Sequence, residues 1–163
     1  MERRSFLRTV PLAAGAGCLG GGSDVVVNVQ RDVDVRPHTG WTKRIPDISD
    51  GAISYIARAD SRFDVYFFDE STIGAYWRFI DGGSPDEQPA GDRRIGMRAV
   101  RTDEGVYEAR TEDGGRQPIE GGGPHYFVVD HSNYRSRGVT EVGEDAGPVS
   151  VFVDLTVTDR QLL

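Results

Sequence analysis

Two long stretches of the chain alternate between apolar and polar residues, a pattern that predicts half-buried β-strands. The first spans residues 24–36, ends before Pro37, and places five valines on one face: Val25, Val27, Val29, Val33 and Val35. The second spans residues 148–159 and alternates in the same way through Val149, Val151, Val153, Leu155 and Val157. We therefore expect each to be a strand with one face in the core and the other in solvent.

Shorter strand candidates fill much of the chain between these two and are separated by glycine, proline and polar residues. They cover residues 41–45, 52–59, 63–68, 95–101, 105–111 and 126–130. Only a polar turn at 60–62 separates the second of these from the third, so we expect 52–59 and 63–68 to pair as a hairpin. Short strands joined by such turns predict an antiparallel β-sandwich.

Residues 69–81 have helical rather than alternating periodicity. Their apolar side chains recur at the spacing of one helix face: Ile73, Tyr76, Trp77 and Ile80. Ser71 is a candidate cap at the start of this helix, and residues 82–85, Gly-Gly-Ser-Pro, end it. The expected fold class is mainly β, an antiparallel β-sandwich with one short helix over residues 25–159, preceded by a non-globular signal segment.

The first residues of the chain have the layout of an export signal rather than of a fold element. A basic start precedes a short, mildly apolar stretch at 10–17 and then Cys18. Arg3-Arg4-Ser5-Phe6-Leu7-Arg8 resembles the twin-arginine export motif, with Arg8 where lysine is usual. The resemblance makes Arg3, Arg4, Phe6 and Leu7 the residues of the export signal, which is an address read by a receptor and not an anchor.

Cys18 is the expected anchor. Gly15-Ala16-Gly17-Cys18 resembles a lipobox, in which small residues precede a lipidated cysteine; Gly15 stands where a larger aliphatic residue is usual. The opening as a whole is similar to that of haloarchaeal lipoproteins, whose twin-arginine signal ends in Cys-Leu-Gly-Gly. This implies a signal peptide at 1–17, a lipidated cysteine with a glycine-rich tether at 18–24, and a domain on the outer face of the cytoplasmic membrane. The alternative, a buried cysteine in a short N-terminal helix, is disfavoured by the surrounding glycines.

The charge of the chain narrows the class of partner. Aspartate and glutamate number 26 against 19 lysines and arginines, for a net charge of −7; 17 of the acids are aspartate, and Lys43 is the only lysine. We interpret this composition as adaptation to molar salt, because such a surface stays hydrated there and the Debye length of about 3 Å screens repulsion among the acids. The alternative is an ordinary acidic protein from a GC-rich genome, in which codon bias replaces lysine by arginine. The acidic balance argues against nucleic-acid binding, and no apolar run approaches the length of a membrane-spanning helix.

His125-Tyr126-Phe127-Val128-Val129-Asp130-His131-Ser132 resembles a strand of small secreted or membrane-attached β-sandwich domains, including Golgi-dynamics-type domains. That strand reads tyrosine-tyrosine-x-valine-x-aspartate-asparagine, so His131 stands where asparagine is usual. The resemblance implies a β-sandwich, and such domains are mostly binding or interaction modules.

The sequence contains few candidates for catalysis or metal binding. Cys18 is the only cysteine, which excludes an intramolecular disulfide and a haem attached through two cysteines. A blue-copper site needs a cysteine thiolate and is excluded if Cys18 carries the lipid. Zinc would have to draw on His38, His125 and His131, but the last two lie roughly 20 Å apart on one strand. The acidic pairs match no calcium loop, and the glycine runs lack the lysine of a phosphate-binding loop.

The run Asp130-His131-Ser132 has the residue types of a catalytic triad, but triads are assembled in space and not in sequence. We accordingly expect no catalytic, cofactor or metal residues, and a non-enzymatic module that binds an envelope protein or a carbohydrate. Trp77 and Tyr76 are candidates to line such a site, although aromatics on an amphipathic helix are more often core. The alternative is a surface hydrolase, which would need a pocket that joins a histidine, a carboxylate and a hydroxyl.

Overall fold

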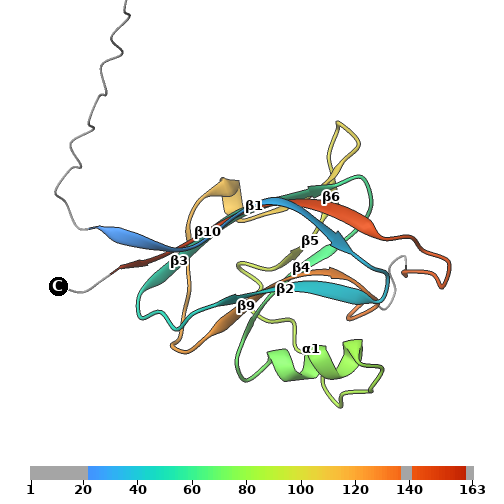
Figure 1. The fold of residues 1–163 in the computed structure, drawn as a ribbon, viewed down its shortest axis with the longest axis horizontal. Coiled ribbons are helices and arrows are strands. Elements are labelled where there is room, and N and C mark those ends of the chain that lie inside the picture. The colour runs from blue at the N-terminus through green and yellow to red at the C-terminus, as the bar shows by residue number, and fades with distance from the viewer. Residues whose placement is uncertain (1–21, 137–140, 161–163) are drawn as a thin grey trace, which may run out of the picture.

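The computed structural model describes residues 22–136 and 141–160, which form two antiparallel sheets packed face to face and one helix (Figure 1). The signal residues Arg3, Arg4, Phe6 and Leu7 and the anchor Cys18 lie outside the described residues. The expected fold class, a mainly β sandwich with one short helix, is confirmed. No helix in the described part of the chain is long and apolar enough to cross a membrane.

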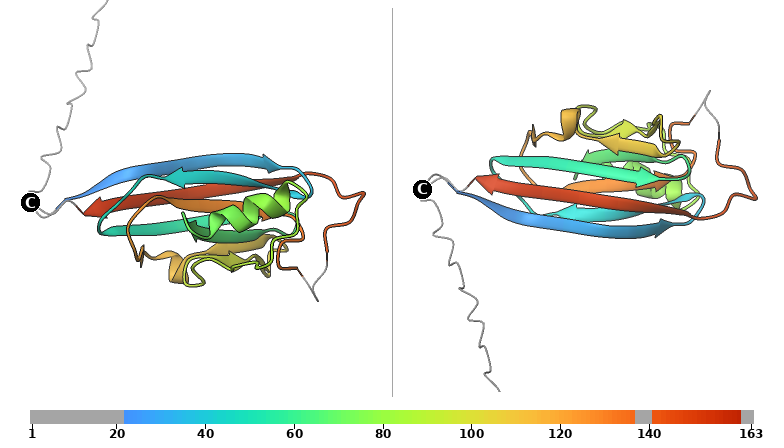
Figure 2. Two further views of the ribbon diagram at one scale, coloured as in Figure 1. Left: turned by 90° about the horizontal axis from the view of Figure 1, so that it is seen from below. Right: turned by 90° about the horizontal axis from the view of Figure 1, so that it is seen from above.

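The larger sheet has six strands, in the order β1-β10-β3-β7-β6, with β8 also paired to β3. Its strands are β1 (Ser23–Val35), β3 (Gly51–Ala59), β6 (Val100–Arg101), β7 (Tyr107–Arg110), β8 (Gln117–Pro118) and β10 (Val149–Arg160). The two long alternating segments predicted from the sequence are β1 and β10, and they pair with each other from Ser23↔Arg160 to Val35↔Val149. Ser23 and Arg160 are therefore paired neighbours. Figure 2 shows the start of β1 and the end of β10 side by side at one end of the sandwich.

The smaller sheet has four strands, in the order β2-β9-β4-β5. They are β2 (Thr39–Ile45), β4 (Asp64–Asp69), β5 (Met97–Arg98) and β9 (His125–His131). The helix α1 (Ile73–Ile80) covers the outer face of this sheet, so the molecule has three layers: large sheet, small sheet and helix (Figure 1). A single turn of 3-10 helix, η1 (Glu112–Gly114), joins β7 to β8.

The main core lies between the two sheets and follows the predicted alternation. In β10 the five predicted residues from Val149 to Val157 are all buried. In β1 four of the five predicted valines are buried, but Val25 is 60% exposed. The register with β10 shifts between Val25 and Val27, so a bulge turns Val25 away from the core.

A second apolar cluster fills the space between the small sheet and α1, and it explains why β4 and β9 do not alternate. In β4, Val65 and Phe67 face the core between the sheets, whereas Tyr66 and Phe68 face the helix. In β9, Phe127 and Val129 face the first core, and Val128 faces the second. A strand that is buried on both faces has a continuous apolar sequence.

The predicted hairpin of 52–59 with 63–68 is wrong. The two segments are strands, β3 and β4, but they belong to different sheets. β3 pairs with β10, β7 and β8, and β4 pairs with β9 and β5. The chain between them crosses from one sheet to the other, which lets β3 and β4 contribute to opposite walls of the same core. Residues 95–101 divide in the same way, with β5 in the small sheet and β6 in the large one.

The helix forms where its periodicity predicts, but Ser71 does not cap it. Thr72 is the N-cap residue and makes no side-chain cap hydrogen bond. The Asp69 carboxylate holds the turn before the helix, accepting hydrogen bonds from the backbone N–H groups of Ser71 (3.0 Å) and Thr72 (2.9 Å). At the other end Gly82 has a φ of 86°, and the N–H of Gly83 bonds to the carbonyl of Arg78. This left-handed glycine ends the helix as the sequence predicted.

Candidate functional site

A cavity of about 500 Å³ opens at the end of the sandwich remote from Ser23 and Arg160. Its walls come from the start of β4, from β5 and β6, from the start of β7 and from the end of β9. Among the described residues, its acidic lining residues are Asp64 and Asp130, and its basic ones are Arg62, Arg98 and Arg101. Because strands β4 and β9 are antiparallel, the start of one and the end of the other meet here.

Asp130 and Asp64 belong to one row of side chains across the small sheet. The backbone register pairs Gly40 with Asp130, Asp130 with Asp64, and Asp64 with Arg98. All four residues therefore face the helix side of the sheet. The row places one arginine and two carboxylates beside one another, with a glycine at its other end.

Asp130 is 1% exposed, yet three donors surround its carboxylate. The Tyr76 hydroxyl donates to Oδ1 at 2.6 Å, the Ser132 hydroxyl donates to Oδ1 at 2.7 Å, and the Ser132 N–H donates to Oδ2 at 3.2 Å. Burial raises the pKa of Asp130 to about 7, although these hydrogen bonds favour the charged form. Burial and the nearby Asp130 also raise the pKa of Tyr76, which keeps its hydroxyl a donor.

Gly40 makes room for the Tyr76 hydroxyl. A Cβ at position 40 would lie 1.9 Å from the Tyr76 oxygen and 3.2 Å from Val128 Cγ1. Tyr76 is 1% exposed, so its ring has little freedom to move aside. The glycine in β2 thus permits the hydrogen bond between α1 and Asp130.

Asp64 is paired more simply. Arg98 Nε donates to its Oδ1 at 3.0 Å, and the two residues are directly opposite on β4 and β5. Burial raises the pKa of Asp64, and the charge and hydrogen bond of Arg98 offset part of that rise. The Asp64 charge is therefore already balanced inside the cavity.

The hydrolase alternative required a pocket in which a histidine, a carboxylate and a hydroxyl are joined. Asp130, His131 and Ser132 do line the cavity, and the Ser132 hydroxyl is bonded directly to Asp130. His131 Nε2 instead lies 3.1 Å from the carbonyl oxygen of Gly147, and among the described residues no hydrogen bond joins it to Ser132 or Asp130. Ser132 Oγ also accepts the N–H of Tyr134 at 3.1 Å, so the hydroxyl holds the turn after β9.

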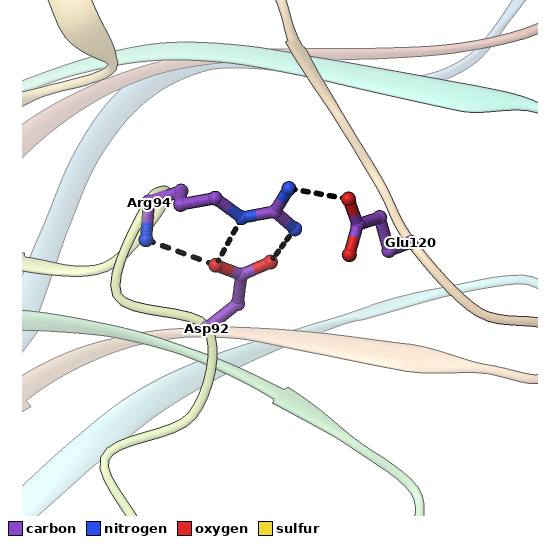
Figure 3. Close-up of polar contacts among 3 residues, drawn as sticks. All are labelled: Asp92, Arg94 and Glu120. Carbon is purple, nitrogen blue, oxygen red and sulfur yellow. Dashed lines mark hydrogen bonds and ion pairs between the residues drawn. The ribbon is translucent and has the colours of Figure 1, made fainter.

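A second hollow, of about 380 Å³, lies at the opposite end of β9 beside His125. Figure 3 shows three of its charged residues: Arg94 donates to Asp92 through Nε and Nη2, at 3.1 and 2.6 Å, and to Glu120 through Nη1 at 2.7 Å. These hydrogen bonds hold the pKa of Asp92 below its usual value. Asp92, Arg94 and Glu120 are thus bonded to one another, and the fourth charged residue of the lining, Asp69, is bonded to Ser71 and Thr72. The first cavity is therefore the better candidate site.

The three histidines do not gather. His125 is buried, stacks on Phe67 with ring centroids 5.3 Å apart, and has a buried Nδ1 without a hydrogen-bond partner among the described residues. His131 lies at the other end of the same strand, and the N–H of His38 bonds to its carbonyl at 2.7 Å. In residues 22–136 and 141–160 no three histidine, cysteine or acidic side chains are placed to hold a metal ion.

Tyr76 and Trp77, the aromatic pair considered for a carbohydrate site, separate. Tyr76 is core, whereas Trp77 is 42% exposed and contacts Tyr126 edge to face at 5.2 Å. Neither residue lines the first cavity.

Sequence reasoning named Asp130, His131 and Ser132 but missed the arginines of the cavity. Arg62, Arg98 and Arg101 come from three separate segments, and nothing in their local sequence distinguishes them from other arginines of the chain. Their meeting follows from β5 and β6 lying in different sheets, which the strand pattern did not predict. No protein family model matches the chain, and no curated protein is significantly similar to it in sequence.

Proposed function

We propose that this protein is an extracytoplasmic binding lipoprotein, held by a lipid on Cys18 at the outer face of the cytoplasmic membrane. The observation that carries the proposal is the position of the cavity. The chain enters the sandwich at Ser23, and the cavity opens at the other end. A domain tethered through residues 18–24 would present this cavity to the medium and not to the lipid surface.

The length of β1 sets the scale of this arrangement. The strand has 13 residues, and at about 3.3 Å per residue it spans about 40 Å. A glycine-rich tether adds freedom of orientation without bringing the cavity closer to the anchor.

The rest of the chain agrees with this location. The order of basic start, apolar stretch and Cys18 resembles that of haloarchaeal lipoproteins, and the charge of −7 with a single lysine suits a surface exposed to concentrated salt. The resemblance of β9 to a strand of Golgi-dynamics-type domains, which are mostly interaction modules, supports a binding role.

We favour binding over hydrolysis because of how Ser132 is held. A nucleophilic serine needs a base that takes its proton and an open approach to its oxygen. The Ser132 hydroxyl is 2.7 Å from Asp130 and accepts the N–H of Tyr134, and the residue is 5% exposed. This geometry supports a structural role for Ser132 at the floor of the cavity.

The anchor is tested by Cys18→Ser in the full chain expressed in a haloarchaeal host. We expect the variant to appear in the medium or to accumulate as unprocessed precursor, since it has no thiol to carry a lipid. Immunoblots of membrane and medium fractions measure this, with Ser23→Ala as the matched control that stays on the membrane. Unchanged membrane retention of Cys18→Ser would refute the anchor.

The export signal is tested separately. Arg3→Lys combined with Arg4→Lys should trap the chain inside the cell, whereas Arg8→Lys, which restores the usual motif, should not.

A further inference from the structure

We propose that the cavity binds a small organic acid, an anionic group attached to an apolar or aromatic body. The inference rests on the proposed binding function and names the class of ligand. It is carried by two properties of the cavity that occur together: guanidinium groups with no carboxylate within 4 Å among the described residues, and an apolar wall beside them.

The charge of the cavity is opposite to that of the chain. Three arginines line it in a protein whose net charge is −7. Arg98 is paired with Asp64, but Arg62 and Arg101 have no carboxylate within 4 Å among the described residues. Guanidinium groups bind carboxylates and sulfonates through two parallel hydrogen bonds, so each of these arginines is suited to an anionic head group.

The two carboxylates of the cavity do not cancel this attraction. Asp64 is held by Arg98 at 3.0 Å. Asp130 lies at the floor, 1% exposed, with its oxygens occupied by Tyr76 and Ser132. A cationic ligand would have to displace Arg98 from Asp64 and would still face Arg62 and Arg101.

The apolar wall determines the rest of the ligand. Phe63 and Ala99 are buried behind the cavity, Tyr107 is half-buried in its wall, and Val100 at its edge is 60% exposed. The Arg62 guanidinium lies 6.0 Å from the centre of the Tyr107 ring, so the charged and aromatic surfaces adjoin. A volume of about 500 Å³ falls within the range of pockets that enclose small molecules.

The test uses two probes with the same aromatic body: 1-anilinonaphthalene-8-sulfonate, which is anionic, and N-phenyl-1-naphthylamine, which is neutral. Fluorescence titration of the purified full chain measures both affinities. We expect Arg62→Gln combined with Arg101→Gln to weaken the anionic probe about tenfold or more, and the neutral probe less than about twofold. Both side chains are exposed, so the fold should survive, and near-ultraviolet circular dichroism verifies that.

The matched control is Arg44→Gln combined with Arg116→Gln, which removes the same two charges from exposed positions that do not line the cavity. It should leave the affinity for the anionic probe within about twofold. The inference is overturned if the wild type does not bind the anionic probe, if the cavity variant binds it as well as the wild type does, or if both double variants lose affinity equally. The outcome with Cys18→Ser is independent: failure there refutes the anchor and leaves the ligand class standing, and the converse also holds.

Discussion

Asp130 is a carboxyl group that almost no water reaches, placed one strand away from a second carboxylate. Isolated burial of such a charge is costly, and proteins avoid the cost by neutralising the group or by surrounding it with donors. Here both occur, because Tyr76 and Ser132 donate to its oxygens while burial raises its pKa to about 7. Through these hydrogen bonds the residue links α1, β9 and the turn after β9.

This raised pKa makes stability depend on pH. In the folded state Asp130 keeps its proton up to about pH 7, whereas in the unfolded chain it loses the proton near pH 4. The contribution of this raised pKa to the free energy of unfolding is therefore fully present below pH 4 and is lost as pH rises through 7. We expect Asp130→Asn to remove on the order of 2 kcal/mol of the decline in unfolding free energy between pH 5 and pH 8.

Urea unfolding at the two pH values measures this decline. The comparison uses the change in unfolding free energy between the two pH values and not its absolute value. The asparagine amide would face the Ser132 N–H, and the cost of that contact is the same at both pH values and cancels. Asp103→Asn, at an exposed position, is the control and should retain the wild-type decline. Equal declines in the wild type and Asp130→Asn would contradict the assignment.

At the scale of elements, α1 owes its place to the small sheet. A helix of eight residues is too short to be stable alone. It is held by packing of Ile73 and Tyr76 on the sheet and by the hydrogen bond from Tyr76 to Asp130. Gly40 on β2 is part of this attachment, since it leaves the space that the Tyr76 hydroxyl occupies.

Gly40→Ala should therefore destabilise the protein by about 1–3 kcal/mol, the usual cost of forcing an extra methyl group into a packed site. The matched control is Gly74→Ala within α1, where a Cβ meets nothing within 4 Å. That change should be neutral or should stabilise by up to about 1 kcal/mol, because alanine favours the helix. Thermal unfolding of the two variants measures the two changes in stability. Equal changes would argue against the close approach of the Tyr76 hydroxyl to Gly40.

The same elements explain what sequence reasoning could and could not predict. Alternation identified β1 and β10 because each buries one face, and helical spacing identified α1. The strand pattern also identified β3 and β4 as strands, but their predicted pairing was wrong. Adjacency along the chain does not reveal whether a turn reverses within one sheet or crosses to another. The cavity depends on that crossing and on the register of Asp64 with Asp130, so its residues could be named singly but not brought together.

The whole molecule combines an acidic surface with a basic cavity. At low salt the excess acidic side chains, which give the net charge of −7, repel one another across the surface. At about 1 M salt the Debye length falls to about 3 Å and this repulsion is screened. Salt should therefore favour the folded state.

We expect the midpoint of thermal unfolding to rise between about 0.1 and 2 M NaCl. Neutralising four exposed acids, by Asp32→Asn, Asp34→Asn, Glu144→Gln and Asp145→Asn, changes the net charge from −7 to −3 and should reduce that rise. Calorimetry of both proteins across the salt series measures the difference. Identical salt dependence would mean that salt acts on hydration in general and not on repulsion among the acids.

The pairing of β1 with β10 also has a mechanical consequence. If the domain is held at Cys18 and pulled through a ligand in the cavity, the load enters at Ser23 and leaves about 40 Å away, along the direction of β1. The twelve registered pairs between β1 and β10 would then be strained together in shear, and no single pair would open first. A pull that separates Ser23 from Arg160 would instead unzip the same pairs one after another. A tether at Cys18 would thus load the sandwich in the direction in which the β1–β10 pairs resist together.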